Sequence, residues 1–168
     1  LNIGYNTNTG GPVTTWAINA SLPSGVSFGT NNGTIYGTAT ELWPQTSYMV
    51  WANNSGGSSV AYLNITVVDE LANIAYNPSS VTIVRGYTMA NVSATNTGGA
   101  VVSWTISPAL PSGLSFDNGT VHGRPLSNMS ATTYTVFANN SGGSVNTTLI
   151  LTVNEPTPNV DYSPDNYT

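Results

Sequence analysis

The strongest constraint on the fold is an internal repeat. Residues 8–28 match residues 96–116 at a separation of 88 positions. Residues 32–67 match residues 118–153 at a separation of 86 positions. The two separations differ where a turn is expected, and turns are where a sheet protein accepts changes in length. A chain that repeats itself in this way builds one kind of structural unit more than once.

The repeat also predicts where the units begin and end. Residues 73–78 (NIAYNP) match residues 159–164 (NVDYSP) at a separation of 86, so a third copy is expected to start near the end of the sequence. Leu1 corresponds to Met89, which lies well inside the second copy. The expected segments are a first repeat lacking its first strand, a second repeat, and the first strand of a third: 1–68, 69–154 and 155–168.

Both copies have the composition of sheet proteins. β-Branched and aromatic residues are separated by clusters of Gly, Asn and Pro, which is typical of short strands joined by turns. Apolar residues alternate in residues 48–52 and 63–67, and again in 134–138 and 149–153. The NNSGGS motif between such strands predicts a hairpin loop. The pattern favours β-sandwiches.

Each copy should bury one aromatic and aliphatic set. A Trp-x-Ile pair lies on an inward face by parity, and we expect it to pack across the sandwich against a Tyr-x-Val pair. These residues are Trp16, Ile18, Tyr48 and Val50 in the first copy, and Trp104, Ile106, Tyr134 and Val136 in the second.

Composition excludes several functions. The chain has 2 basic and 7 acidic residues, a net charge of −5 and no Cys. Two Arg residues cannot neutralise a nucleic-acid backbone, so nucleic acid is not an expected partner. Without Lys or Cys there is no Schiff-base chemistry, thiol catalysis, disulfide or zinc–thiolate site. No run of 18 apolar residues predicts a membrane span in this segment, and the acidic, charge-poor composition fits an extracellular surface.

No constellation of residues predicts an enzyme. His122 is the only histidine, and a Ser-His-Asp triad could form only if it meets Asp117, so a strand-surface role is preferred. The acidic residues do not recur as pairs in the two copies, as a glycosidase would need. Asp69-Glu70 at the junction of the copies raises the alternative of Ca²⁺, but a plain acidic linker is favoured. We therefore predict no catalytic residue, metal or cofactor.

Two pairs of N-glycosylation sequons recur in both copies. Asn32 corresponds to Asn118, and Asn53 corresponds to Asn139. All four are expected at exposed turns, where a glycan could be attached. The alternative, that these Asn residues serve turn geometry alone, has equal weight.

Exposed aromatic residues are the remaining indication of ligand binding. Trp43-Pro44 is expected in a loop, and Trp43 aligns with Met129 in the second copy, so it is not repeated. Trp51 aligns with Phe137. Contact with a ligand and packing at a repeat junction are both open for Trp43.

Several motifs together resemble a known family. They are Trp-x-Ile, LPSG followed by Ser-Phe, Asn-Gly-Thr, Ala-Asn-Asn-Ser-Gly-Gly-Ser and a final Leu-x-Ile/Leu-Thr-Val, in two copies across nearly the whole chain. They resemble the putative-Ig repeats of large prokaryotic surface proteins, which are related to cadherin-like and dystroglycan-type sandwiches. The resemblance is closest over Pro108–Pro125. It implies tandem Ig-like/cadherin-like β-sandwiches that act as extracellular spacer or adhesive modules, without catalytic residues to carry over.

The predicted function is a structural repeat segment of a secreted or cell-surface stalk, adhesin or filament. Its predicted partners are neighbouring copies of the repeat, in the same chain or in a homopolymer, and glycans. The segment 155–168 aligns with the start of the second copy, so we expect Val160 and Tyr162 to donate a strand to the first unit of the next copy. The alternative function is an adhesion module that binds a carbohydrate or protein ligand.

Overall fold

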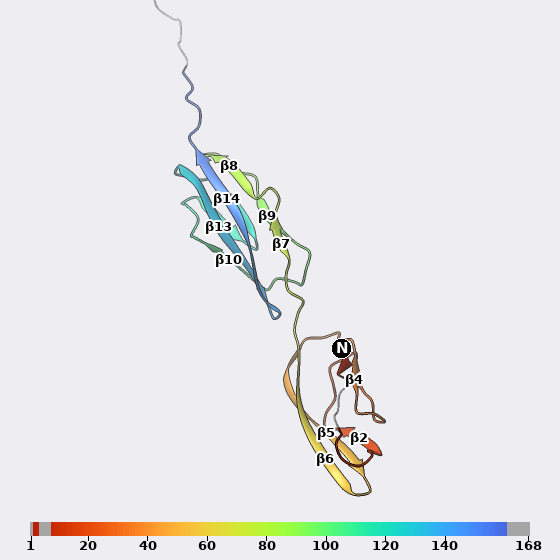
Figure 1. Cartoon of the computed structure of the whole chain (residues 1–168). Helices are drawn as coiled ribbons and strands as arrows, with labels where there is room; N and C mark the ends of the chain where they lie inside the picture. The colour runs from red at the N-terminus through yellow and green to blue at the C-terminus, as the bar shows by residue number, and fades with distance from the viewer. Residues whose placement is uncertain (1, 4–7, 161–168) are drawn as a thin grey trace, which may run out of the picture. The chain divides into compact units, whose positions relative to one another are not determined.

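The computed structural model describes residues 2–3 and 8–160. This part of the chain is built from strands joined by turns, without helices, which confirms the all-β prediction. It offers no helical stretch of the length and hydrophobicity that a bilayer crossing requires. The chain forms two compact units, Leu1–Val68 and Asp69–Thr168, which we call the first and second units (Figure 1).

The six described strands of the first unit correspond in order to the last six strands of the second unit. The first unit holds β1 (Asn2–Ile3), β2 (Thr15–Ile18), β3 (Val26–Phe28), β4 (Ile35–Gly37), β5 (Trp43–Asn54) and β6 (Gly57–Val67). The second unit holds β7 (Ile74–Tyr76), β8 (Ser80–Val84), β9 (Val92–Asn96), β10 (Ser103–Ser107), β11 (Leu114–Asp117), β12 (Thr120–Gly123), β13 (Met129–Asn140) and β14 (Gly143–Asn154).

The second unit is a sandwich of two four-stranded sheets. Their strand orders are β10-β13-β14-β8 and β11-β12-β9-β7. β8 runs parallel to β14, from Ser80 beside Ile150 to Val84 beside Asn154, and lies at the edge of its sheet in Figure 1. The chain therefore enters one sheet as β7 and crosses to the other as β8. The inner faces enclose buried residues from both sheets: Tyr76, Ile83, Met89, Val121, Tyr134, Val136, Leu149, Leu151 and Val153.

The first unit has the same plan with a smaller core. Its described strands form the sheets β2-β5-β6 and β1-β4-β3. Ile35, Tyr48 and Ile65 are buried between them. Within the described residues, no strand takes the place beside β6 that β8 takes beside β14. The buried set of the first unit is accordingly shorter than that of the second.

The predicted packing of the Trp-x-Ile pairs is wrong in one respect. β2 bonds directly to β5, and β10 bonds directly to β13, so Ile18 lies beside Val50 and Ile106 beside Val136 in the same sheet. The pairs share an inner face with the Tyr-x-Val residues instead of facing them across the sandwich. Parity predicts the face of a side chain, whereas the partner sheet depends on long-range strand pairing.

Candidate functional site

The structure brings His122 and Asp117 together on the β11–β12 hairpin. His122 Nε2 lies 2.8 Å from Asp117 Oδ2. The side chain of Asp117 is largely exposed, and the side chain of His122 is partly exposed. Within the described residues, this carboxylate is the hydrogen-bond partner of the imidazole. The arrangement is a surface ion pair when His122 is protonated, and such pairs contribute little to stability.

The junction acids Asp69 and Glu70 are held by the β13–β14 hairpin. Asp69 N–H donates to Ser141 Oγ at 2.8 Å, and Ser141 Oγ–H donates to Asp69 Oδ2 at 2.7 Å. Glu70 O accepts from Asn140 Nδ2 at 2.7 Å. Among the described residues, His, Cys, Asp and Glu do not gather in groups of three or more that could hold a metal. Asp69 thus anchors main chain to a hairpin tip.

One pair of recurring sequons lies at exposed turns, as predicted. Asn32 and Asn118 occupy the Asn-Gly turns that follow β3 and β11, and both side chains are exposed. Asn118 has φ +46°, and the following Gly119 has φ +75°. Asn32 Oδ1 accepts from Thr34 N at 3.1 Å. An Asn tolerates this left-handed backbone better than most residues do.

The other pair does not lie at turns. Asn53 and Asn139 are half-buried residues of β5 and β13, because each strand continues for one further residue before the hairpin turns. Asn53 Nδ2 donates to Thr15 Oγ1 at 3.4 Å, and Asn139 Nδ2 donates to Ser103 Oγ at 3.3 Å. The prediction of exposed turns is wrong for these two residues.

Trp43 is also not in a loop. It is the first residue of β5, and its Nε1–H donates to the hydroxyl of buried Tyr48 at 3.0 Å. Tyr48 in turn donates to Ser21 O at 3.1 Å. In the second unit Met129 takes the same place, and Tyr134 Oη–H donates to its sulfur at 3.2 Å. Trp43 is thus bound to the core tyrosine of its unit.

An aromatic patch that the sequence interpretation missed lies on the outer face of β5 and β6. Met49 pairs across the strands with Tyr62, and Trp51 pairs with Val60. Tyr62 is 73% exposed and Val60 is 43% exposed. We call these four residues the outer aromatic face. Exposed apolar residues that lie together on a sheet are a feature of interaction sites.

The outer aromatic face is not repeated. Its counterparts in the second unit are Thr135, Phe137, Asn146 and Thr148, of which only Phe137 is apolar. At three of these four outward positions, the second unit has a polar residue. A comparison of the copies restricted to outward positions would have identified Tyr62 from the sequence.

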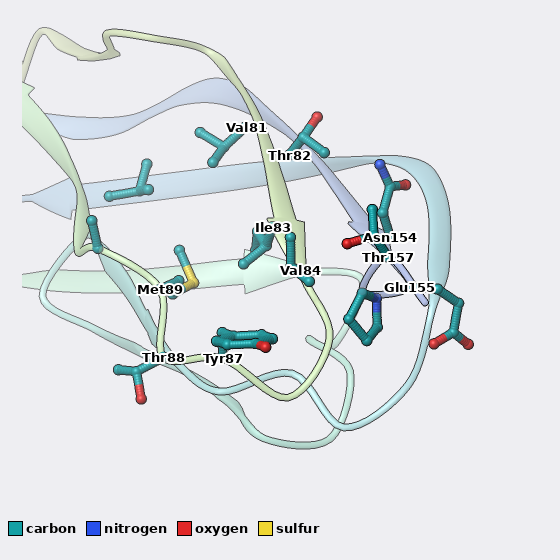
Figure 2. A pocket seen from close by; sticks show the side chains of 13 residues that line it. Val81, Thr82, Ile83, Val84, Tyr87, Thr88, Met89, Asn154, Glu155 and Thr157 are labelled. Carbon is teal, nitrogen blue, oxygen red and sulfur yellow. The ribbon is translucent and has the colours of Figure 1, made fainter. Parts of the chain in front are cut away.

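An open apolar groove lies at the end of the second unit, beside β8 (Figure 2). Its volume is about 670 Å³. Ile83, Tyr87 and Met89 gather around the hollow in Figure 2. Next to it, Arg85 Nη2 lies 2.7 Å from Glu155 Oε2, so a surface ion pair borders the segment that leaves β14. The groove has the shape and lining to receive apolar side chains.

Comparisons with known proteins find a matching family and similar solved structures. A family model described as "Putative Ig domain" matches residues 2–68 and 72–154. The similar solved structures include Drosophila OTK extracellular domains 3–5, with a TM-score of 0.46 and 19% identity over 83% of this chain and 50% of that chain. They also include human Protocadherin-24 EC1-2, with a TM-score of 0.41 and 15% identity over 85% of this chain and 82% of that chain.

Curated relatives of this chain are adhesins. A "Serine-rich adhesin for platelets" of Staphylococcus aureus (strain MRSA252) is 29% identical over 131 residues, which cover 76% of this chain and 10% of the adhesin. Another adhesin of that name from Staphylococcus aureus is 30% identical over 139 residues, covering 76% of this chain and 6% of the adhesin. The chain thus spans a tenth or less of these relatives' length. The family and these relatives confirm the predicted extracellular or cell-surface location.

Proposed function

Because this chain belongs to the Putative Ig domain family, we propose that it is a structural repeat segment of an extracellular stalk, adhesin or filament, joined to neighbouring copies by strand addition. One observation carries the proposal. In the second unit, β7 places Ile74 and Tyr76 in the sandwich, where they are 7% and 6% exposed. Tyr76 also donates a hydrogen bond to Gly119 O at 2.8 Å.

The repeat offers the same strand to a neighbour. Val160 and Tyr162 align with Ile74 and Tyr76. Val160 is 70% exposed, so it is available for pairing, and Tyr162 lies outside the described residues. An uncovered sheet edge is a template for an added strand, because its N–H and C=O groups lack partners. We expect Val160 and Tyr162 to enter the first unit of the next copy as Ile74 and Tyr76 enter the second unit.

The test compares one copy of the chain with two copies fused in tandem. Hydrogen exchange is measured in the first unit of each copy. In the fusion, the downstream first unit should gain protection that the upstream one lacks, and Val160→Asp with Tyr162→Asp should abolish the gain. Val102→Asp, at a residue that is 78% exposed, is the control. Equal protection of both first units, at a concentration where sedimentation shows single fused chains, would contradict strand addition. Sedimentation of the single copy shows whether separate chains associate in the same way.

The proposal includes no catalytic role. It is supported by the exposed position of the His122–Asp117 pair and by the scattered acidic residues. Assays with ester and glycoside substrates should show no turnover. A hydrolysis rate that disappears in His122→Ala or Asp117→Asn would contradict this part of the proposal.

We also propose that Asn32 and Asn118 carry N-glycans if the source cell attaches them. Both lie exposed at turns in intact Asn-x-Thr sequons. Asn53 and Asn139 remain candidates, but their amide nitrogens donate hydrogen bonds to hydroxyl groups of the neighbouring strand. Mass spectrometry of the protein from its native source tests this, and unmodified Asn32 and Asn118 in a sample that is glycosylated elsewhere would refute it.

The outer aromatic face favours a second candidate function, carbohydrate binding. Tyr62 and Trp51 present ring surface next to the polar side chains of Ser47 and Asn64, which hydrogen-bond to each other on the same outer face. Aromatic rings combine a large apolar surface with polar contacts at their edge. On a glycan array, binding should be lost when Tyr62→Thr and Val60→Asn introduce the residues of the second unit. Tyr87→Ser is the control. Unchanged binding in the double variant would exclude this face.

A further inference from the structure

Two glycine turns in the second unit hold an extended stretch of main chain. The turns are Gly98-Gly99 and Gly142-Gly143, and the stretch is Asp69–Asn73, which leads into β7. A Cβ atom on Gly99 would clash with Glu70 O, and one on Gly142 would clash with Asp69 O. Only glycine lets the stretch approach this closely. We call the two turns, with the Asn side chains that brace them, the glycine seat.

The glycine seat recognises main chain at defined positions. Asn140 Nδ2 donates to Glu70 O, and Gly99 N–H donates to Leu71 O at 3.1 Å. In the other direction, Asp69 N–H donates to Ser141 Oγ. Asn73 is bound through its backbone and its side chain. Its backbone N–H donates to Asn96 Oδ1 at 3.0 Å, and its side-chain Nδ2 donates to Thr97 Oγ1 at 2.8 Å. The seat thus uses N–H groups of the stretch only at its first and fifth positions.

The first unit contains the same seat, already formed. Its turns are Gly10-Gly11 and Gly56-Gly57. Asn8 Nδ2 donates to Gly11 O at 2.7 Å, as Asn96 Nδ2 donates to Gly99 O at 2.8 Å in the second unit. Likewise, Asn54 Nδ2 donates to Pro12 O at 3.1 Å. The corresponding hydrogen bond in the second unit, from Asn140 Nδ2 to Ala100 O, is also 3.1 Å long. A groove of about 270 Å³ is lined by both turns. A preformed site binds without the cost of ordering itself.

We propose that the glycine seat of the first unit binds the segment Glu155–Asn159 of a neighbouring copy. This rests on the proposed function, in which copies are joined end to end. Glu155 aligns with Asp69, and Asn159 aligns with Asn73, the residue that the seat binds through both its backbone and its side chain. Every residue of the segment is exposed. The carboxylate of Glu155 is paired with Arg85 of its own unit. The backbone N–H of Glu155 is the group that would take the place of the Asp69 N–H in the seat.

The hydrogen bonds of the seat are compatible with prolines at two positions of the segment. Pro156 and Pro158 align with Glu70 and Ala72. Within the described residues, the N–H groups of Glu70 and Ala72 make no hydrogen bond in the seat. A proline at either position therefore loses no hydrogen bond. Ala72 is buried, so the ring of Pro158 must pack where the methyl group of Ala72 packs in the second unit. Proline also holds its own φ and that of the preceding residue in an extended range. The occupant is therefore a Glu-Pro-x-Pro-Asn main chain presented in extended form.

The test adds a synthetic peptide of residues 154–160 to the full chain and follows glycine amide signals by NMR. Signals of Gly10, Gly11, Gly56 and Gly57 should shift saturably, whereas those of the second unit's seat, which already holds Asp69–Asn73, should not. In the peptide, Asn159→Pro should weaken binding by at least about tenfold, because it removes a required N–H and the side-chain amide. Pro156→Ala should leave binding within about threefold.

A variant of the protein supplies a second test. Gly11→Ala places its Cβ 3.2 Å from the end of the Asn54 side chain, so the first unit should keep its fold. It should still weaken peptide binding by at least about tenfold, since the new methyl group enters the groove. Absence of shifts, or equal binding to the Gly11→Ala variant, would overturn the proposal. The short peptide ends at Val160, so strand addition can fail in the tandem fusion while seat binding succeeds.

Discussion

The two units share one motif pair and differ in what the motifs hold. In the second unit, the NTGG and NNSGG turns enclose Asp69–Asn73, and the glycines have main chain against them. In the first unit, the same turns line a groove, and a Cβ on Gly57 would meet nothing within 4 Å. An identical sequence element is thus a closed packing contact in one place and an accessible surface in the other. The role of a glycine turn thus depends on whether a segment of main chain packs against it.

The largest expected difference in stability is between the variants Gly142→Ala and Gly56→Ala. Gly142→Ala should destabilise the second unit by about 1–3 kcal/mol, because its methyl group collides with a main-chain oxygen that cannot swing away. Gly56→Ala should change the first unit by less than about 0.5 kcal/mol, since its Cβ lies 3.2 Å from a side-chain atom of Asn54. Urea unfolding followed at residues of each unit measures both values. Equal losses would show that the first seat is not open in solution.

The core tyrosines give the next comparison. Tyr48 Oη donates to Ser21 O and accepts from Trp43 Nε1, whereas Tyr134 Oη has the weak acceptor Met129 Sδ. Tyr48→Phe should therefore cost about 1–2 kcal/mol, because it leaves two polar groups unpaired. Tyr134→Phe should cost less than about 1 kcal/mol, because a thioether is a poor acceptor. Thermal unfolding of both variants tests the order, and a larger loss in Tyr134→Phe would reverse it.

The smallest effect is a difference in acid sensitivity. The backbone N–H of Ser24 donates to Glu41 Oε1 at 2.8 Å and holds the pKa of Glu41 below its ordinary value. Ser127 takes this place in the second unit. A lowered folded-state pKa stabilises above the unfolded-state pKa and loses this effect as the pH falls through the folded-state pKa. The first unit should therefore lose a little stability on acidification, and Glu41→Gln should remove that loss. An unchanged pH profile of the variant would count against the contact.

Local features of the fold could be predicted from the sequence. The NNSGGS hairpins and the Asn32 and Asn118 turns depend on residues that are neighbours in the chain, where Gly and Asn adopt backbone conformations that others avoid. Alternation identified buried Tyr48 and Tyr134, because strand side chains point to opposite faces in turn. The predictions were wrong where a residue's place depends on pairing with a strand that is distant in the sequence. Trp43 reads as a loop residue beside a proline, but it pairs with Val67 as the first residue of β5.

The sequence by itself determined that this chain is a tandem of all-β units, because the repeat and its strand pattern are local and occur twice. It also determined which residues carry the glycine turns. Only the tertiary structure decided that Ser80–Val84 pairs in parallel with Ile150–Asn154, and that Asp69–Asn73 passes between two turns about 40 residues apart in the chain. The same holds for the outer aromatic face, whose chemistry is set by strand register. These contacts join segments distant in sequence, and pairing of that kind is selected by the packing of the whole unit.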